Sequence, residues 1–312
     1  MPDKTNCHWT SQLNLKHLLL IVYIFFIHLS LMGQDDSVSF TVSGSNVDRP
    51  VYTKIDDLAL MESKEELSLF RLDRDQEILV AMQFEDNLDE GFWFIADQNV
   101  SAKYILKKKK SSPVNQAIRI IESDGDLKFE SNGKSILNYR FGMTDPPQGV
   151  DSLYKKSGYI HPVWSPSGEV LSRIQPPDHY HHYGIWGPWT RTVINDRNVD
   201  FWNLYEGQGT VLFDSFTHRE QGPVFSEVKA KQLHLDFKAP ENERVSIVES
   251  LNLRVWNLNT AKGKFIIDYT SDFITPIESG LKLIKYRYGG GIGFRATELW
   301  HKENTKVLTS EG

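Results

Sequence analysis

Short stretches of alternating or compact apolar residues recur along most of this chain, separated by turn-forming residues. Residues 37–42 (SVSFTV) alternate apolar and polar positions, as a half-buried strand does, and residues 78–84 and 91–96 are compact apolar runs. Residues 117–123 and 127–131 flank the sequence DGD, which predicts a hairpin. Further strand-like stretches follow at 134–141, 245–256 and 264–274. We therefore expect a mainly β protein, an antiparallel β-sandwich with a mutarotase-like supersandwich as one form of it.

The pattern divides into three parts. The four lysines 107–110 lead into Ser111, Ser112 and Pro113, a composition typical of a solvated connector. We therefore predict a small N-terminal β unit over residues 34–112 and a larger sandwich domain over residues 113–312.

The first 33 residues have the pattern of a secretory signal peptide. Lys4 and Lys16 precede the apolar run 18–27, and the small residue Gly33 stands before the polar stretch QDDS. The run is shorter than the roughly 20 apolar residues that a membrane span needs. We expect an exported protein, periplasmic or extracellular, with an uncleaved N-terminal anchor as the alternative and no other contact with a membrane.

Composition and charge exclude several function classes. The formal charge of −6 argues against a nucleic acid partner, because phosphate binding favours a basic surface. The only cysteine, Cys7, lies within the signal, so the mature chain offers no thiolate ligand or cysteine nucleophile. A small molecule or an oligosaccharide is therefore the expected ligand, and the oligomeric state stays open.

Imidazole and indole side chains are concentrated in one part of the sequence. Four of the ten histidines and four of the eight tryptophans fall between residues 161 and 202: His161, His179, His181, His182, Trp164, Trp186, Trp189 and Trp202. This clustering is the strongest chemical signal in the chain.

One interpretation of the cluster is a metal site. In an extended DHYHHYG segment, His179 and His181 would point to one face, while Asp178 and His182 would point to the other. Two such histidines can bind one divalent metal ion, with His161 as the third ligand. A carboxylate, Glu249 or Asp178, would complete the set.

Two other interpretations need no metal. Histidines can act as general acid or base, oriented by a carboxylate, while tryptophan faces stack on a sugar ring. Alternatively, the cluster is an aromatic core in which the histidines only satisfy buried backbone groups. For the enzyme interpretation we select five candidate catalytic residues and five candidate substrate-binding residues: His161, Asp178, His182, Glu249 and Arg295, and Trp164, Trp186, Trp189, Trp202 and Asp200.

A long motif carries a family resemblance. Residues 157–190, followed by VDFW at 199–202, closely resemble the bacterial PmoA-like family, which is catalogued as methane oxygenase PmoA. Stretches 48–55, 288–297 and 307–312 are also similar to its pattern. The matching motif positions are His161, Asp178, His179, His181, His182, Trp186, Asp200 and Trp202.

The resemblance implies an exported protein of polysaccharide-degrading bacteria rather than a membrane methane monooxygenase. Members usually continue beyond the point where this sequence stops, so the resemblance also implies a chain truncated at its C-terminus. We predict a carbohydrate-active enzyme of undetermined reaction. The alternatives are a metal-dependent oxygenase, which would hold a divalent ion, and a non-catalytic sugar-binding module.

Overall fold

The computed structural model describes residues 37–57, 62, 64–85, 88–97, 101–111, 118–258, 263–286, 290–306 and 308. The predicted signal peptide and the segment 309–312 lie outside the described residues. The described chain is almost entirely β-structure, and its only helices are single 3-10 turns of three residues. The prediction of a mainly β protein is thus confirmed. No helix among these residues is long and apolar enough to cross a membrane.

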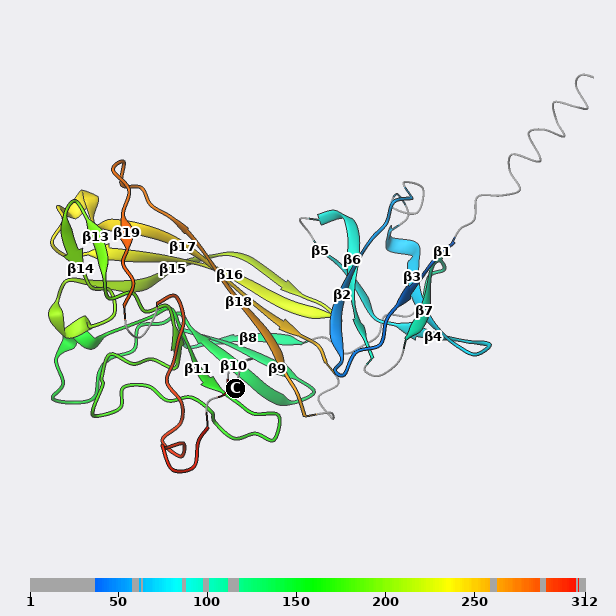
Figure 1. Ribbon diagram of the computed structural model, residues 1–312, viewed down its shortest axis with the longest axis horizontal. Coiled ribbons are helices and arrows are strands. Elements are labelled where there is room, and N and C mark those ends of the chain that lie inside the picture. The colour runs from blue at the N-terminus through cyan, green and yellow to red at the C-terminus, as the bar shows by residue number, and fades with distance from the viewer. Residues whose placement is uncertain are drawn as a thin grey trace, which may run out of the picture.

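The N-terminal strands form a unit of two antiparallel sheets (Figure 1). The first sheet has the order β1-β7-β3-β4 and the second the order β2-β6-β5. Their bounds are β1 (Ser37–Val42), β2 (Arg49–Lys54), β3 (Leu67–Asp73), β4 (Gln76–Val80), β5 (Met82–Glu85), β6 (Leu88–Ala96) and β7 (Ala102–Lys108), with η1 (Lys64–Glu66) before β3. The buried residues Leu69, Phe92, Phe94 and Leu106 make a core of its own between the sheets.

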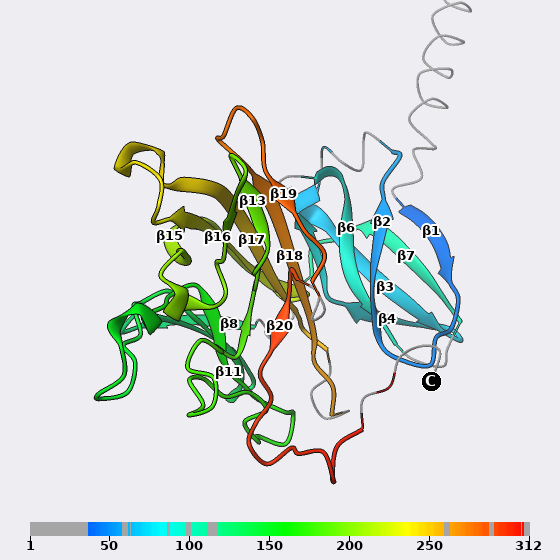
Figure 2. The same ribbon diagram turned by 60° about the vertical axis from the view of Figure 1, so that its left-hand side comes forward.

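The second part of the chain is a β-sandwich. One sheet has the order β20-β12-β11-β10-β9-β8, and the other contains four long strands in the order β15-β16-β17-β18. The bounds are β8 (Arg119–Ser123), β9 (Asp126–Ser131), β10 (Lys134–Arg140), β11 (Tyr159–Val163), β12 (Ile185–Trp186), β15 (Gly209–Gln221), β16 (Phe225–Asp236), β17 (Val245–Trp256), β18 (Ile266–Ile274) and β20 (Gly293–Phe294). Figure 2 shows the long strands side by side.

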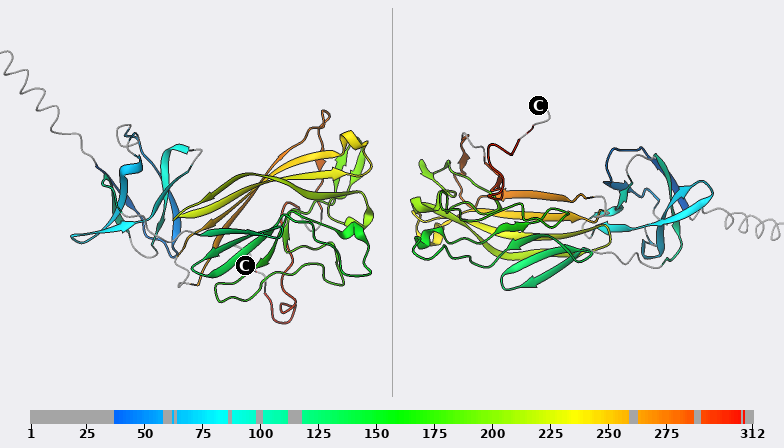
Figure 3. Two further views of the ribbon diagram at one scale, coloured as in Figure 1. Left: turned by 180° about the vertical axis from the view of Figure 1, so that it is seen from behind. Right: turned by 90° about the horizontal axis from the view of Figure 1, so that it is seen from below.

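Apolar side chains from both sheets meet in one core. Phe129 of β9 and Leu137 of β10 pack with Val228 of β16 and Leu253 of β17, and all four are buried. The long sheet lies over the sheet that contains β8 to β10 (Figure 3, left). The predicted hairpin is confirmed, because β8 pairs with β9 across a turn in which Asp124 and Gly125 have positive φ.

Short elements close one end of the sandwich. A small sheet has the order β14-β13-β19, with β13 (Thr192–Ile194), β14 (Arg197–Val199) and β19 (Lys282–Leu283). Three 3-10 turns accompany it: η2 (Ser152–Tyr154), η3 (Leu204–Glu206) and η4 (Glu241–Glu243).

A charged and aromatic contact joins the N-terminal unit to the sandwich. The Arg254 guanidinium of β17 contacts Glu85 of β5 at 2.7 Å and Glu227 of β16 at 2.5 Å. Trp93 of β6 packs on Trp256 with ring centroids 4.9 Å apart. Strands β1 to β7 and strands β8 to β20 pair within separate sheets. The connecting residues 112–117 lie outside the described residues, so the division into domains stays a prediction.

Candidate functional site

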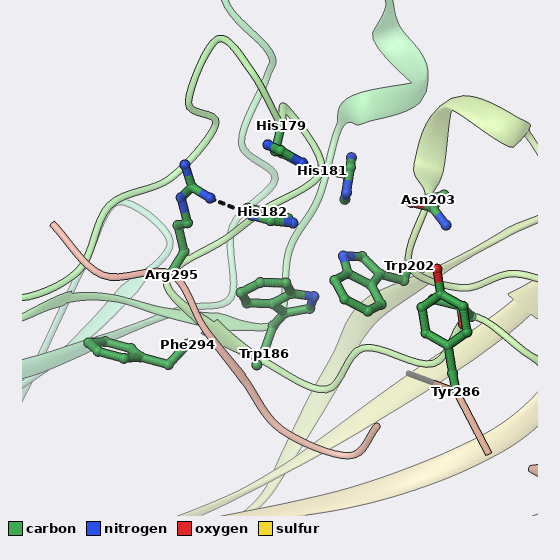
Figure 4. A pocket seen from close by; sticks show the side chains of 11 residues that line it. His179, His181, His182, Trp186, Trp202, Asn203, Tyr286, Phe294 and Arg295 are labelled. Atoms are coloured by element: carbon green, nitrogen blue, oxygen red, sulfur yellow. Dashed lines mark hydrogen bonds between the residues drawn. The ribbon is translucent and has the colours of Figure 1, made fainter. Parts of the chain in front are cut away.

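A cavity of about 430 Å³ opens at the edge of the sandwich that carries β12 and β20. Segments from three parts of the sequence line it: the loop before β12, the segment from β12 to η3, and residues 286 and 293–295. The lining residues are His179, His181, His182, Trp186, Thr190, Trp202, Asn203, Tyr286, Gly293, Phe294 and Arg295. In Figure 4 the three imidazoles lie above the two indoles, with Arg295 and Phe294 on one side and Asn203 and Tyr286 on the other.

The loop that carries the histidines is a series of turns. The backbone N–H of His179 donates to the carbonyl of Pro176 at 2.8 Å, and that of His182 donates to the carbonyl of His179 at 3.0 Å. The prediction of an extended segment is therefore wrong. Pro176 and Pro177 remove two backbone donors and favour a turn, so no ladder can form there. As a result His182 faces the same cavity as His179 and His181.

Gly184 allows the chain to return from this loop into β12. Its φ of +55° is in the left-handed region, and a Cβ there would lie 2.0 Å from the carbonyl oxygen of Ile160. With glycine at this position, Ile185 pairs directly with Ile160 of β11. The next residue, Trp186, is thereby fixed at the floor of the cavity.

The imidazoles and indoles contact one another as one aromatic group. The rings of His179 and His182 are stacked, with centroids 4.6 Å apart and an interplanar angle of 21°. The His181 ring stands edge-on to His182 at 4.6 Å. His182 in turn lies 5.3 Å from Trp186 and 5.9 Å from Trp202. Both indoles also pack against the buried cluster of Tyr159, Tyr183 and Leu204, so the floor is part of the core.

An ion pair borders the imidazoles. The Nη2 of Arg295 lies 3.2 Å from both carboxylate oxygens of Asp178, and Nδ1 of His179 lies 2.8 Å from Asp178 Oδ2. The hydrogen bond from His179 and, to a smaller extent, the charge of Arg295 together lower the pKa of Asp178 to about 2. Asp178 is therefore a carboxylate at neutral pH.

Two of the cavity histidines are held neutral. Burial lowers the pKa of His181 to about 4 and that of His182 to about 3, and the neighbouring imidazoles and Arg295 contribute in the same direction. These rings therefore offer one hydrogen-bond donor and one acceptor each, and no charge, near pH 7.

Asp200 supports the cavity without lining it. Its Oδ1 accepts from the backbone N–H groups of Trp202 and Asn203 at 2.8 Å, and its Oδ2 accepts from the Asn203 amide at 2.6 Å. Asp200 thus positions one indole and one amide of the wall, whereas the sequence predicted a direct contact with substrate.

Four predicted residues lie away from the cavity. Trp189 packs with Ile194 and Phe201 at the small sheet, and Trp164 forms a bridge with Val170. His161 does not line the cavity, and its Nδ1 lies 2.9 Å from Ser172 Oγ. Burial, with a further effect of Arg140, lowers the pKa of His161 to about 4.

Glu249, the fourth, lies inside the sandwich. Only 1% of this residue is exposed, and its carboxylate accepts from His234 Nε2 at 2.8 Å and from Ser271 Oγ at 2.6 Å. The sequence predicted Glu249 as a metal ligand or a catalytic residue, and its side chain does not line the cavity. The predicted ligand set of His179, His181, His161 and a carboxylate is not assembled. Within the described ranges, no group of three or more His, Cys, Asp or Glu side chains is placed to hold a metal ion.

Sequence reasoning missed five lining residues: Thr190, Asn203, Tyr286, Gly293 and Phe294. Asn203 directly follows Trp202, and Phe294 directly precedes Arg295, so proximity to predicted residues was a usable signal for these two. Tyr286 lies more than 80 positions beyond Trp202 in the chain, and only the fold brings their rings to 6.4 Å.

Comparison with known proteins identifies a family, but it does not identify an activity. The model of a family of unknown function, DUF6807, matches residues 126–312, which is more than half of the chain, so the protein belongs to this family. The matched region contains every residue of the cavity. No curated protein and no solved structure matches the chain.

Proposed function

We propose that this member of the DUF6807 family is an exported carbohydrate-active enzyme in which imidazole side chains of the cavity transfer protons on a bound sugar. The supporting observation is a pair of stacked imidazoles with opposite hydrogen-bond partners. Asp178 accepts a hydrogen bond from His179, whereas Arg295 donates one to His182. Export rests on the N-terminal sequence pattern, and the PmoA-like resemblance stays a prediction.

Asp178 sets the protonation of His179. A carboxylate can only accept, so Nδ1 of His179 donates the hydrogen of this 2.8 Å contact. In a neutral His179 the lone pair is then on Nε2. An imidazole oriented by a carboxylate in this way is suited to act as a general base.

Arg295 sets the opposite tautomer in His182. A guanidinium can only donate, so Nδ1 of His182 accepts from Arg295 Nη1, 3.4 Å away, as the dashed line in Figure 4 marks. Since His182 is neutral, its proton is on Nε2, where it can donate to a substrate oxygen. The stacked pair therefore supplies one proton acceptor and one proton donor.

The indoles supply the surface that a sugar ring needs. Trp202, which is partly buried, offers an apolar face with a polar N–H at one end, a combination suited to the mixed surface of a saccharide, and the buried Trp186 forms the floor beside it. Among the lining residues that the structure describes, none is a carboxylate, so the paired-carboxylate route of glycoside hydrolysis has no pair here. The acid–base work would fall to the imidazoles.

The test is a screen of the purified protein against polysaccharides and oligosaccharides, with both binding and products measured. We expect His179→Gln and His182→Gln to lower turnover by about 10² to 10⁴-fold while binding changes little. Trp186→Ala should weaken binding itself. Binding without any product in the unsubstituted protein would identify a sugar-binding module instead, and turnover that survives both histidine substitutions would refute the proposal.

A further inference from the structure

Three tyrosines form an aromatic surface beside the cavity that the proposed chemistry does not use. Tyr154 stacks on Tyr205, with ring centroids 6.1 Å apart and an interplanar angle of 19°, and it meets Tyr180 edge-on at 5.6 Å. We call these residues, Tyr154, Tyr180 and Tyr205, the tyrosine platform. They come from η2, the histidine loop and η3.

The platform residues are close in sequence to residues of the cavity wall. Tyr180 stands between His179 and His181, whose rings line the cavity, and Tyr205 is two residues after Asn203, which also lines it. Asn203 precedes η3 as its N-cap residue and is fixed by Asp200, so the turn that carries Tyr205 starts at the wall. A ligand that extends out of the cavity past Asn203 would reach Tyr205, two residues further along the chain.

The platform is also held in place. The Tyr183 hydroxyl donates to the backbone carbonyl of Tyr154, and the Tyr154 ring packs against the same buried cluster as Trp202. Tyr205 is nevertheless 64% exposed and lies outside that cluster. A large aromatic side chain fixed at the surface beside a cavity is typical of a binding surface.

Charge near the platform favours a neutral ligand. Lys155 is paired with Asp145 at 2.8 Å, while the exposed carboxylates Asp151 and Glu206 flank η2 and η3. An anionic sugar would be repelled by these two carboxylates. A neutral sugar presents no charge to them and can stack on a phenol ring.

We propose that the tyrosine platform binds the second and later residues of a neutral glycan chain whose first ring occupies the cavity. The ligand class is therefore an oligosaccharide or polysaccharide rather than a free monosaccharide. This inference rests on the proposed function, because the first ring must enter the cavity.

The test measures affinity against chain length. Ladders of one to six residues of cello-, xylo-, manno- and laminari-oligosaccharides, with oligogalacturonides as the anionic ladder, are titrated into the purified protein by calorimetry. We expect affinity for a neutral ladder to rise from one residue to three. Tyr205→Ala should weaken the affinity for the longer members by about two- to tenfold and leave the affinity for the monosaccharide unchanged.

Two further variants separate stacking from folding effects. Tyr205→Phe retains the aromatic face and should keep the gain with length. Tyr52→Ala removes a tyrosine packed on Trp93 in the N-terminal unit and should also keep it. Affinity that does not rise with length, or a rise that persists in Tyr205→Ala, would overturn this inference and leave the proposed function standing. A gain confined to oligogalacturonides would overturn the neutral assignment, and no binding of any ladder would overturn both proposals.

Discussion

Two histidine–carboxylate pairs in this protein have the same nitrogen–oxygen distance and opposite surroundings. His179 and Asp178 lie 2.8 Å apart at the cavity, with 46% and 58% of their side chains exposed. His234 and Glu249 lie 2.8 Å apart between the sheets, with 0% and 1% exposed. The first pair can reach a ligand and the second cannot. The difference teaches that access, and not the pairing itself, separates a candidate catalytic dyad from a structural one.

The buried pair is part of a larger polar group in the core. Glu249 also accepts from Ser271, and its charge acts on Lys156, which is itself buried. Burial lowers the pKa of Lys156 to about 8, while Glu249 acts in the opposite direction. Each charge here depends on its partners, since an isolated buried charge is costly.

The largest effect should follow from breaking the buried pair. Glu249→Ala removes the acceptor of His234 and the negative charge near Lys156, so we expect a loss of roughly 3–5 kcal/mol of unfolding free energy. Denaturant unfolding followed by intrinsic fluorescence measures it. Glu249→Gln, which retains an acceptor, should lose less. A loss below about 1 kcal/mol in Glu249→Ala would show that the pair is dispensable.

Removal of the carboxylate at the cavity should have the opposite effects, with little change in unfolding free energy and a large loss of turnover. Asp178→Ala removes an exposed partner, so unfolding free energy should change by less than about 1 kcal/mol. Turnover of a sugar substrate should fall about 10²-fold, because His179 loses the acceptor that fixes its tautomer. Unfolding and initial-rate measurements on one preparation test both parts. A large loss of stability with unchanged turnover would assign Asp178 a structural role.

A smaller effect should appear in the pH dependence of stability. An unfolded histidine titrates near pH 6.5, whereas the pKa of His182 in the folded protein is about 3. Between these values the unfolded chain binds a proton that the folded chain does not. The contribution is therefore present above pH 6.5 and is lost as pH falls toward 3. We expect the unfolding free energy of His182→Asn to fall less steeply with decreasing pH than that of the unsubstituted protein. Denaturation midpoints at pH 4, 5, 6 and 7 measure this slope.

The control for the pH experiment is a histidine outside the cavity. His301 is exposed and lies outside the cavity, so His301→Asn removes one imidazole without changing the cavity rings. Equal slopes in the unsubstituted protein and His182→Asn would contradict the prediction.

Local patterns were sufficient where neighbours in sequence are also neighbours in space. Alternation in residues 37–42 predicted β1, and DGD between two apolar stretches predicted the hairpin of β8 and β9. The density of histidine and tryptophan identified five of the cavity residues, namely His179, His181, His182, Trp186 and Trp202, and Arg295 was selected separately as a candidate catalytic residue. Asp178, also predicted, holds two of them.

Local patterns failed where burial or long-range packing decides. Period-two alternation placed His182 opposite His179, and the turns after Pro176 bring both into one cavity. Glu249 was selected as a candidate catalyst because a carboxylate in an otherwise apolar strand often has a function. In the structure this carboxylate is hydrogen-bonded to His234, 15 residues away on the neighbouring strand. The two residues come together only because β16 and β17 pair.

The sequence by itself determined the mainly β architecture and the chemical composition of the cavity, because strand alternation and residue clustering are properties of short segments. The tertiary structure decided which histidines share a space, which carboxylate reaches them, and that Tyr286 and Tyr205 lie at the cavity and beside it. These positions depend on the pairing and packing of strands more than 100 residues apart in the sequence. A pattern within a short segment carries no information about such contacts.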